Sequence, residues 1–408
     1  MSIGGGAADA GKVRGTSVGD IAIVGIGEVP TASMPERTPW DIVFDTCIEA
    51  VEDSGIGKDE IQGVISVAPI AQPVIETELA YGQLPERLGL RGVRDCAMVN
   101  AGGASTSNAL RLAEQWIASG IADSVLVQQV TVHSTMPLAQ QIDAFARAGV
   151  DMQWEYPYGT TYNIIMGLLA NRYMYESGAS AEDMASVVTA LRSWAEHDPY
   201  SLFYGRPAPS VEQVLGSELL NTPLHKRESN VLADGGAALV VVSAQKAKEL
   251  GTPAAYKLGD SSRYFSGTCV ARDFDTVADG VRVTAAEAMA RAGVAREDID
   301  LWNVYVAYPL AHPLMAENLG VAPAGQGARY FAEGRMSFGG DIAWSTIGDA
   351  PGRGHTGSGV GTACYVETAR QLMGRAGRRQ VADCRFVYQN SAGGSGFNNI
   401  ATIWGRDA

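Results

Sequence analysis

Two glycine-rich loops stand directly before helical stretches, and loops of this kind can hold a negative charge or a reactive side chain. The first is 100–105 and the second is 352–357, which contains His355. A helix N-terminus offers free N–H groups and a partial positive charge, so each loop could bind an oxyanion. An imidazole in the second loop could also move a proton. The alternative is structural, since glycines let a helix pack closely against a sheet.

The cysteines of the chain do not look like nucleophiles or metal ligands. Their number is odd, their spacing is wide and no C-x-x-C pair occurs, which argues against a disulfide framework and a structural zinc site. We interpret them as small buried apolar residues. The chain has five histidines and no H-E-x-x-H motif, so we expect no metal centre built by the protein. The cysteines are Cys47, Cys96, Cys269, Cys364 and Cys384.

The segments around the two loops occur twice, in the same order. The stretch 54–61 (SGIGKDEI) follows one predicted helix, and 292–299 (AGVAREDI) follows another. Further along, 121–129 (IADSVLVQQ) resembles 381–389 (VADCRFVYQ), again after a helix. Each half therefore runs helix, strand, glycine-rich loop, helix, strand, which indicates an internal duplication.

Helices that alternate with strands predict an α/β layered fold. The strands at 21–24 and 237–242 are nearly continuous apolar runs, which is typical of strands buried on both faces. We also expect a strand at 301–306. Between the halves lies an insertion, about 131–232, that is rich in aromatic residues and broken by prolines. It predicts either a lid over a large apolar ligand or a surface for a partner subunit.

Composition excludes several classes of function. With 46% hydrophobic and 19% charged residues, the chain can bury a sizeable core and has too little charge for a disordered protein. Its net charge of −14 repels nucleic acid and anionic membrane surfaces at long range. No apolar run approaches the roughly 20 residues of a membrane helix, and residues 1–19 lack a hydrophobic signal core. We therefore expect a cytoplasmic protein with a flexible arm over residues 1–19.

From about residue 20 to residue 404 the chain resembles the thiolase superfamily, and within it the sterol-carrier-protein-type branch. Two further stretches carry this resemblance: 170–174 (ANRYM) is similar to the family's A-x-R-Y-M helix, and 232–237 (LADGGA) to its S-D-G-A-A turn. The resemblance implies the thiolase fold, in which two similar halves form five α/β/α/β/α layers and a loop domain is inserted in the first half. The implied halves are 20–250 and 251–408.

The family's two cysteine positions are altered. Its nucleophilic Cys lies in an N-x-x-C-x-S-G loop, and here Gly103 stands at that position and leaves room where the family places sulfur. Ser105 stands where the family has a helix-start serine. The second Cys, in C-x-G-G, is replaced by Ser391, and its loop continues through Gly393 and Gly394.

Two other family segments complete the implied site. The N-E-A-F segment reads Tyr305 to Tyr308 here, with Tyr305 at the Asn position, and the G-H-P loop keeps His355 but has Thr356 in place of Pro. In the family's fold these segments face each other, so Tyr305 and His355 would be neighbours. The resemblance thus implies His355, Tyr305 and Ser391 as catalytic residues. The implied substrate-binding residues are Gly103, Ser105, Tyr308, Gly393 and Gly394.

These changes exclude a thiolase mechanism, because an acyl-enzyme on sulfur needs a thiolate. An imidazole and a phenol can instead donate hydrogen bonds to a thioester oxygen and move a proton. That suits retro-aldol cleavage of a bulky β-hydroxyacyl-CoA, with no cofactor beyond the coenzyme A of the substrate. A site without cysteine and with a tyrosine resembles the thiolase-like aldolases that remove steroid side chains in bacteria.

Two other functions remain as alternatives, and three further residues are candidates for the site or resemble its motifs. A Cys-independent acyltransferase or condensing enzyme could form an acyl-enzyme on Ser105 or Ser391, although Ser105 is better explained as a helix cap. A non-catalytic acyl-CoA-binding scaffold would also lack both cysteines. His133 could reach the mouth of the pocket, and Glu155 could be an extra acid or base. His312 imitates the G-H-P motif but follows the wrong strand, so we expect a structural role.

The resemblance also implies partners. The substrate would be an acyl-CoA or a carrier-bound thioester, and family members dimerise through the sheet of the first half, so we expect a homodimer. Members of this branch often pair with a small OB-fold, zinc-ribbon protein. The aromatic stretch Trp154–Tyr162 could dock such a partner, or it could be a lid over the chain's own site. We expect no nucleic-acid or membrane partner.

Overall fold

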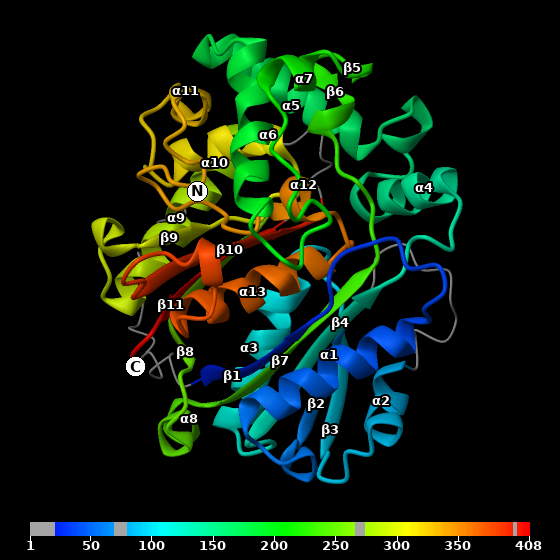
Figure 1. Cartoon of the computed structure of the whole chain (residues 1–408), viewed down its shortest axis with the longest axis vertical. Helices are drawn as coiled ribbons and strands as arrows, with labels where there is room; N and C mark the ends of the chain where they lie inside the picture. Colours follow the sequence, from blue (N-terminus) through cyan, green and yellow to red (C-terminus); the bar gives the residue numbers. More distant parts are fainter. Residues whose placement is uncertain (1–20, 69–79, 266–273, 395–397) are drawn as a thin grey trace, which may run out of the picture.

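The computed structural model of the chain describes residues 21–68, 80–265, 274–394 and 398–408 (Figure 1). The arm expected over residues 1–19 lies outside these ranges, and so does Cys269. The strands are β1 (Ile21–Glu28), β2 (Gly63–Val67), β3 (Asp95–Val99), β4 (Ser124–Thr131), β5 (Leu219–Asn221), β6 (Leu224–His225), β7 (Gly235–Ser243), β8 (Ala255–Tyr264), β9 (Leu301–Asn303), β10 (Phe386–Gly393) and β11 (Asn398–Gly405).

The first-half helices and those of the insertion are α1 (Pro39–Ser54), α2 (Ala80–Leu88), α3 (Ser105–Ala118), α4 (Leu138–Gly149), α5 (Tyr162–Ser177), α6 (Ala181–Ala195), α7 (Val211–Leu215) and α8 (Ala244–Leu250). The second-half helices are α9 (Phe274–Ala292), α10 (His312–Asn318), α11 (Gly327–Ala332), α12 (Asp349–Arg353) and α13 (Gly359–Leu372). The expected domain boundary at 250/251 falls in the turn between α8 and β8.

The ends of several helices follow from the local sequence. Thr38 and Ser180 form capping boxes with the residue three positions on, so the first free N–H groups of α1 and α6 are satisfied. Gly55 after α1 and Gly293 after α9 both have left-handed backbone conformations, with φ of 68° and 66°, which stop a helix. The same kind of turn thus follows both helices, as the duplicated sequence predicted.

The strand order confirms the duplication. One half has β2-β4-β7-β1 side by side, and the other has β9-β10-β11-β8. In each half the first two strands pair in parallel and the later pairs are antiparallel. β3 adds an edge strand to the first half, and its counterpart in the second half is a single bridge between Trp302 and Trp344. The halves join where β1 pairs with β8 at two positions, so the strands form one connected sheet.

The expected five layers are confirmed, and the core shows how they pack (Figure 1). Helices α3 and α13 form the middle layer, where Ala109 and Tyr365 pack among residues from both half-sheets. Helix α1 covers the outer face of the first half-sheet and α9 the outer face of the second. In β1, Ile23 belongs to the middle cluster and Ala22 to the outer one. The strands are therefore buried on both faces, as their apolar runs predicted.

The strand expected at 301–306 is shorter than predicted. It ends at Asn303, because side chains rather than a neighbouring strand bind the next backbone N–H groups. Tyr305 N–H donates to Oδ1 of Asn390 at 2.9 Å, and the N–H groups of Val306 and Ala307 both donate to Oδ2 of Asp349 at 3.0 Å. Ala307 has a φ of 61°. The chain therefore turns at this point and presents Tyr305 from a loop.

The insertion between β4 and β7 carries α4 to α7 and the small hairpin β5–β6. In Figure 1 these elements gather in the upper part of the view, together with α10, α11 and α12 of the second half. Tyr173 of α5 connects the two groups, because its hydroxyl donates to Glu317 of α10 at 2.6 Å. The insertion thus covers the end of the sheet from which the glycine-rich loops leave.

Candidate active site

One cavity of about 640 Å³ collects most of the residues that the sequence singled out. It lies where the loops around the ends of β4, β9 and β10 meet the loops before α3, β7 and α13 and the helices α4 and α5. Large apolar and aromatic side chains dominate its wall, as in a site for a bulky apolar group. Six of them are Phe145, Tyr162, Met166, Leu220, Leu232 and Tyr308.

Gly103 and Tyr305 meet at the floor of the cavity. A Cβ atom placed on Gly103 would lie 2.2 Å from Cε1 of Tyr305 and 2.4 Å from the carbonyl oxygen of Ala392. Both separations are far inside van der Waals contact. The room that we expected Gly103 to leave is therefore taken by the phenol ring, and a side chain at position 103 is incompatible with Tyr305 in this place.

The Tyr305 hydroxyl is a proton donor at neutral pH. The side chain is 4% exposed, and burial, reinforced by the Asp349 carboxylate, raises its pKa well above the ordinary value near 10. No hydrogen-bond partner of this hydroxyl is found among the described residues. Tyr308 differs, because its hydroxyl donates to Oδ1 of Asn163 at 2.8 Å.

His355 lines the same cavity as a neutral imidazole that carries its proton on Nε2. The N–H of Gly357 donates to Nδ1 of His355 at 3.2 Å, and a ring nitrogen that accepts carries no proton. Burial, followed by the nearness of His133, lowers the pKa of His355 to about 4. At neutral pH the ring therefore offers an Nε2–H donor.

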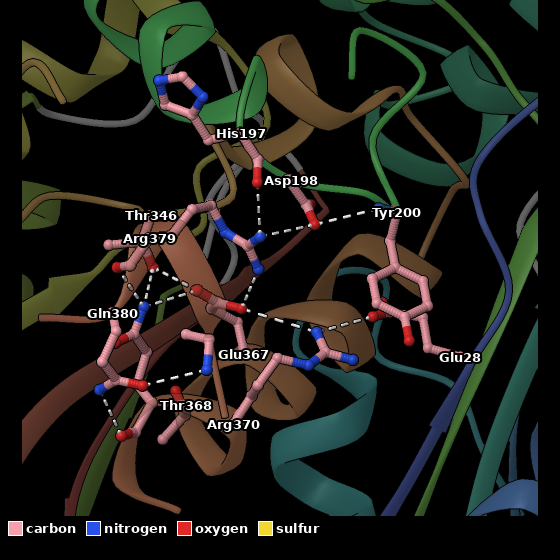
Figure 2. A network of polar contacts seen from close by, with 12 residues as sticks. Glu28, His197, Asp198, Tyr200, Thr346, Glu367, Thr368, Arg370, Arg379 and Gln380 are labelled. Carbon is pink, nitrogen blue, oxygen red and sulfur yellow. Dashed lines mark hydrogen bonds and ion pairs between the residues drawn. The ribbon is translucent and has the colours of Figure 1, made fainter. Parts of the chain in front are cut away.

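A closed ring of six buried charges holds the loop before His355. Three arginines and three carboxylates alternate around it, and each side chain contacts two of opposite sign. In order, the ring is Glu28, Arg353, Asp198, Arg379, Glu367 and Arg370. Figure 2 labels five of these residues. Since Arg353 lies two residues before His355, the ring fixes the imidazole relative to β1 and α13.

The loops that carry Gly103 and the glycines of β10 touch through their backbones. A Cβ on Gly393 would lie 1.9 Å from the carbonyl oxygen of Ala101, so only glycine allows this approach. Gly394 lines the cavity, whereas Gly393 does not. Ser105 supports the loop, because its Oγ donates to the Gly102 carbonyl at 2.6 Å and accepts the Ala101 N–H.

Ser391 is fully buried within β10 and is not among the residues that line the cavity. Its implied role as a catalytic residue therefore has no support in the geometry. Ser105 likewise lies outside the lining. Of the eight residues assigned from the sequence, the cavity brings together Gly103, Tyr305, Tyr308, His355 and Gly394.

His133 is the site residue to which sequence reasoning gave too little weight. We expected it at the mouth of the pocket, but it lines the cavity and is only 1% exposed. Within the described ranges, neither of its ring nitrogens has a hydrogen-bond partner. Its position two residues after β4, a strand parallel to β2, was the available signal, because ligands bind beyond the carboxyl ends of such strands.

His312 and Glu155 lie outside the cavity lining. Nδ1 of His312 accepts from the Trp344 indole N–H at 2.9 Å, and its Nε2 lies 3.2 Å from Oδ2 of Asp349. This places His312 behind the Tyr305 loop, where it orients Asp349. Oε2 of Glu155 accepts the N–H of Asp151 at 2.7 Å, which is a local turn.

The described residues contain neither a cysteine in the cavity lining nor a cluster of metal-ligating side chains. Cys47, Cys364 and Cys384 are buried and Cys96 is partly exposed, and none of these four lines the cavity. Burial raises the pKa of Cys47 and of Cys384 to about 12. Within the described ranges no group of three His, Cys, Asp or Glu side chains is arranged to hold a metal ion. None of the helices there combines the length and apolar character that a membrane crossing requires.

Comparison with known sequences points to one superfamily. Residues 265–406 match the family described as "Thiolase C-terminal domain-like". The chain is 28% identical over 390 residues to an acetyl-CoA acetyltransferase of Methanothermobacter thermautotrophicus, covering 95% of this chain and 100% of the relative. It is 24% identical over 367 residues to the 17-hydroxy-3-oxo-4-pregnene-20-carboxyl-CoA lyase of Mycobacterium tuberculosis, covering 87% and 92%.

A solved structure gives the same picture. The chain superimposes on the Ltp2-ChsH2(DUF35) aldolase with a TM-score of 0.80 and 25% identity, covering 95% of this chain and 97% of that one. These similarities support an enzyme, and the similar proteins include one named for acyl transfer and two named as a lyase and an aldolase.

Proposed function

Because the chain belongs to the thiolase superfamily, in its sterol-carrier-protein-type branch, we propose that it is a carbon–carbon lyase that cleaves a bulky β-hydroxyacyl-CoA by a retro-aldol reaction. One observation carries the proposal: the Tyr305 ring fills the space where the superfamily's nucleophile would stand, beside Gly103. A side chain at position 103 therefore has no room to form a covalent acyl-enzyme. A reaction that needs only hydrogen-bond donors and a proton acceptor does not require such a side chain.

The two donors fit the charge that develops in such a cleavage. When the Cα–Cβ bond breaks, its electron pair moves toward the thioester and places negative charge on the carbonyl oxygen. The Nε2–H of His355 and the hydroxyl of Tyr305 are both protonated at neutral pH, so both can stabilise that oxygen. The products are a ketone and a shortened acyl-CoA, and no cofactor beyond the coenzyme A of the substrate takes part.

The acyltransferase alternative has less support from the geometry. It requires a side chain that carries the acyl group, and neither Ser105 nor Ser391 lines the cavity. The scaffold alternative leaves unexplained why the cavity keeps two protonated donors, Tyr305 and His355, that no described residue accepts from.

The test is to incubate the protein with β-hydroxyacyl-CoA thioesters that differ in the size of the β-substituent. We expect a ketone and the shortened acyl-CoA, formed faster from substrates with large apolar β-substituents. Intact mass spectrometry of the protein during turnover should show no acyl adduct. An adduct on a serine would favour the acyltransferase, and tight binding without turnover would favour the scaffold.

We also propose that an OB-fold, zinc-ribbon partner binds the outer part of the stretch Trp154–Tyr162. This stretch divides in the structure, because Trp154 and Tyr158 are 66% and 83% exposed while Tyr162 lines the cavity. Leu138 of α4 and Leu168 of α5 are exposed as well, at 62% and 53%. Co-purification of such a partner, lost in a Trp154→Ser and Tyr158→Ser variant, would support the proposal. A partner that binds the variant equally well would contradict it.

A homodimer is the second proposed assembly. β3 is the last strand of the sheet on its side, and among the described strands it pairs only with β2. The other side of β3 can therefore accept the same strand of a second copy. Analytical ultracentrifugation should show a dimer that persists to nanomolar concentration, and a monomer at micromolar concentration would refute it.

A further inference from the structure

The proposed reaction needs a proton acceptor that neither Tyr305 nor His355 supplies. A retro-aldol cleavage starts with loss of the proton from the β-hydroxyl group. Tyr305 holds its proton at neutral pH because burial raises its pKa, and His355 faces the cavity with its accepting nitrogen already bound by Gly357. Both groups are donors, so the acceptor must lie elsewhere.

The other charged groups that line the cavity do not fill this role. Oδ1 of Asp234 accepts the N–H groups of His133 and Ser134 at 2.5 and 2.9 Å, and its Oδ2 accepts the N–H of Met34 at 2.6 Å. Its two oxygens therefore hold backbone in place. Lys226 has three donors and no acceptor, and it lies at the exposed rim, 3.5 Å from Glu218.

His133 has free acceptor capacity inside the cavity. Neither ring nitrogen has a hydrogen-bond partner among the described residues, although the side chain is only 1% exposed. Such a buried and unsatisfied imidazole costs free energy, and a substrate hydroxyl would recover it. Asp234 accepts a hydrogen bond from the His133 backbone N–H, and this bond fixes the position of the backbone that carries the ring.

His133 also lies near His355, and it lines the same cavity as Tyr305. Its ring centroid is 5.5 Å from that of Phe145, and the His355 centroid lies 5.3 Å from the same ring. A charge on His133 would lower the pKa of His355, which again places the two imidazoles close together. Both histidines line the same cavity, so one bound substrate would lie close to both.

We propose that His133 is the general base that removes the β-hydroxyl proton, a role that rests on the lyase function proposed above. The proton moves from the hydroxyl to a ring nitrogen of His133, and the O–H electron pair forms the ketone C=O bond. The Cα–Cβ pair passes to the thioester enolate, which His355 and Tyr305 stabilise. Tyr305 then protonates Cα, and the proton on His133 returns to the phenolate.

The protonation state of His133 suits this task. Burial lowers its pKa to about 4, against an opposing effect of Asp234, so the ring is neutral and able to accept at pH 7. Negative charge that develops on the thioester oxygen raises the proton affinity of a nearby imidazole during the reaction.

The test compares His133→Gln and His133→Ala with the wild-type protein on a β-hydroxyacyl-CoA that the wild type cleaves. We expect kcat to fall by about 10²- to 10⁴-fold with KM changed by less than about threefold, because the base acts in the chemical step. Added imidazole should restore part of the activity of His133→Ala and none of that of His133→Gln. His197→Gln, outside the cavity, is the matched control and should keep wild-type kcat. Thermal unfolding checks that each variant is folded.

Three outcomes are distinguishable. A wild-type protein that cleaves no β-hydroxyacyl-CoA overturns the lyase function and this role with it. An active wild type with unchanged kcat in both His133 variants overturns the role alone. A loss confined to KM also overturns it, since it would make His133 a binding residue. Loss of kcat with imidazole rescue supports it.

Discussion

Tyr305 stands where a side chain of residue 103 would stand, with its Cε1 2.2 Å from the Cβ position of Gly103. The two positions are 202 residues apart in the chain, yet their side chains compete for one volume. The absence of a side chain at position 103 and the presence of the phenol ring therefore depend on each other. A cysteine at position 103 would need Tyr305 to move first.

Gly103→Ala should lower both stability and activity. The added methyl group overlaps Tyr305 and the Ala392 carbonyl, and such overpacking costs about 1–3 kcal/mol of unfolding free energy. The cost should fall by at least about 0.5 kcal/mol in a Tyr305→Ala background, because one of the two contacts is then removed. Urea unfolding of the two single variants and the double variant measures this coupling. Strictly additive costs would mean that the ring is not the obstacle.

Tyr305→Phe should reduce cleavage while leaving the fold intact. The ring volume is kept, and no hydrogen bond to a described residue is lost. Removing one donor to a developing oxyanion costs about 10²- to 10³-fold in kcat, and His355→Ala should cost a similar factor. Steady-state kinetics with one β-hydroxyacyl-CoA gives both values. Wild-type kcat in both variants would remove these residues from the mechanism.

Glu28→Gln should destabilise the protein strongly. It leaves Arg353 and Arg370 each with one carboxylate partner instead of two, inside the protein. Breaking a buried ion pair costs about 3–5 kcal/mol. Glu333→Gln is the matched control, since its pair with Arg329 is exposed and should cost less than about 1 kcal/mol. Equal losses in the two variants, measured by chemical denaturation, would contradict the importance of the ring.

Acid should destabilise the protein between about pH 6.5 and pH 4. Histidines of the unfolded chain titrate near about 6.5, whereas the pKa of His133 and that of His355 are about 4 in the folded protein. In this window the unfolded state binds more protons, so the free energy of unfolding falls as pH falls. The stability is fully present above about pH 6.5 and is lost toward pH 4.

Each histidine can contribute up to about 3 kcal/mol to this loss. Urea unfolding at pH 4 to 7 measures it, and a double variant with His133→Gln and His355→Gln should show a flatter profile. An unchanged slope in the double variant would place the titrating groups elsewhere.

The repeated elements could be predicted from the sequence because their signals are local. Apolar runs mark β1 and β7, and the turns after α1 and α9 share the same glycine position. The position of His355 before α13 followed from the same local pattern. These features depend on neighbours a few residues away, which a sequence displays directly.

The missed features depend on partners far along the chain. β9 ends early because Asp349 and Asn390 bind the backbone that follows it. The burial of His133 depends on how the insertion folds over the cavity. The charge ring joins Arg370 to Glu28 across 342 residues. A local sequence pattern does not show which residues hundreds of positions apart will meet. The charged residues of the ring could therefore not be recognised as partners from the sequence.

The charge ring also makes the chain indivisible. The segment after residue 251 supplies three arginines of the ring and one glutamate, while Glu28 and Asp198 come from the part before it. A chain cut at the midpoint would leave the three ring arginines of the second piece with one ring carboxylate, Glu367, because the other two belong to the first piece. The duplicated architecture resembles two similar units. Because the ion pairs of the ring join the two pieces, neither piece can bury its charged residues in the native arrangement without the other. Unfolding should therefore be a single cooperative event, and the separated pieces should fold only when mixed.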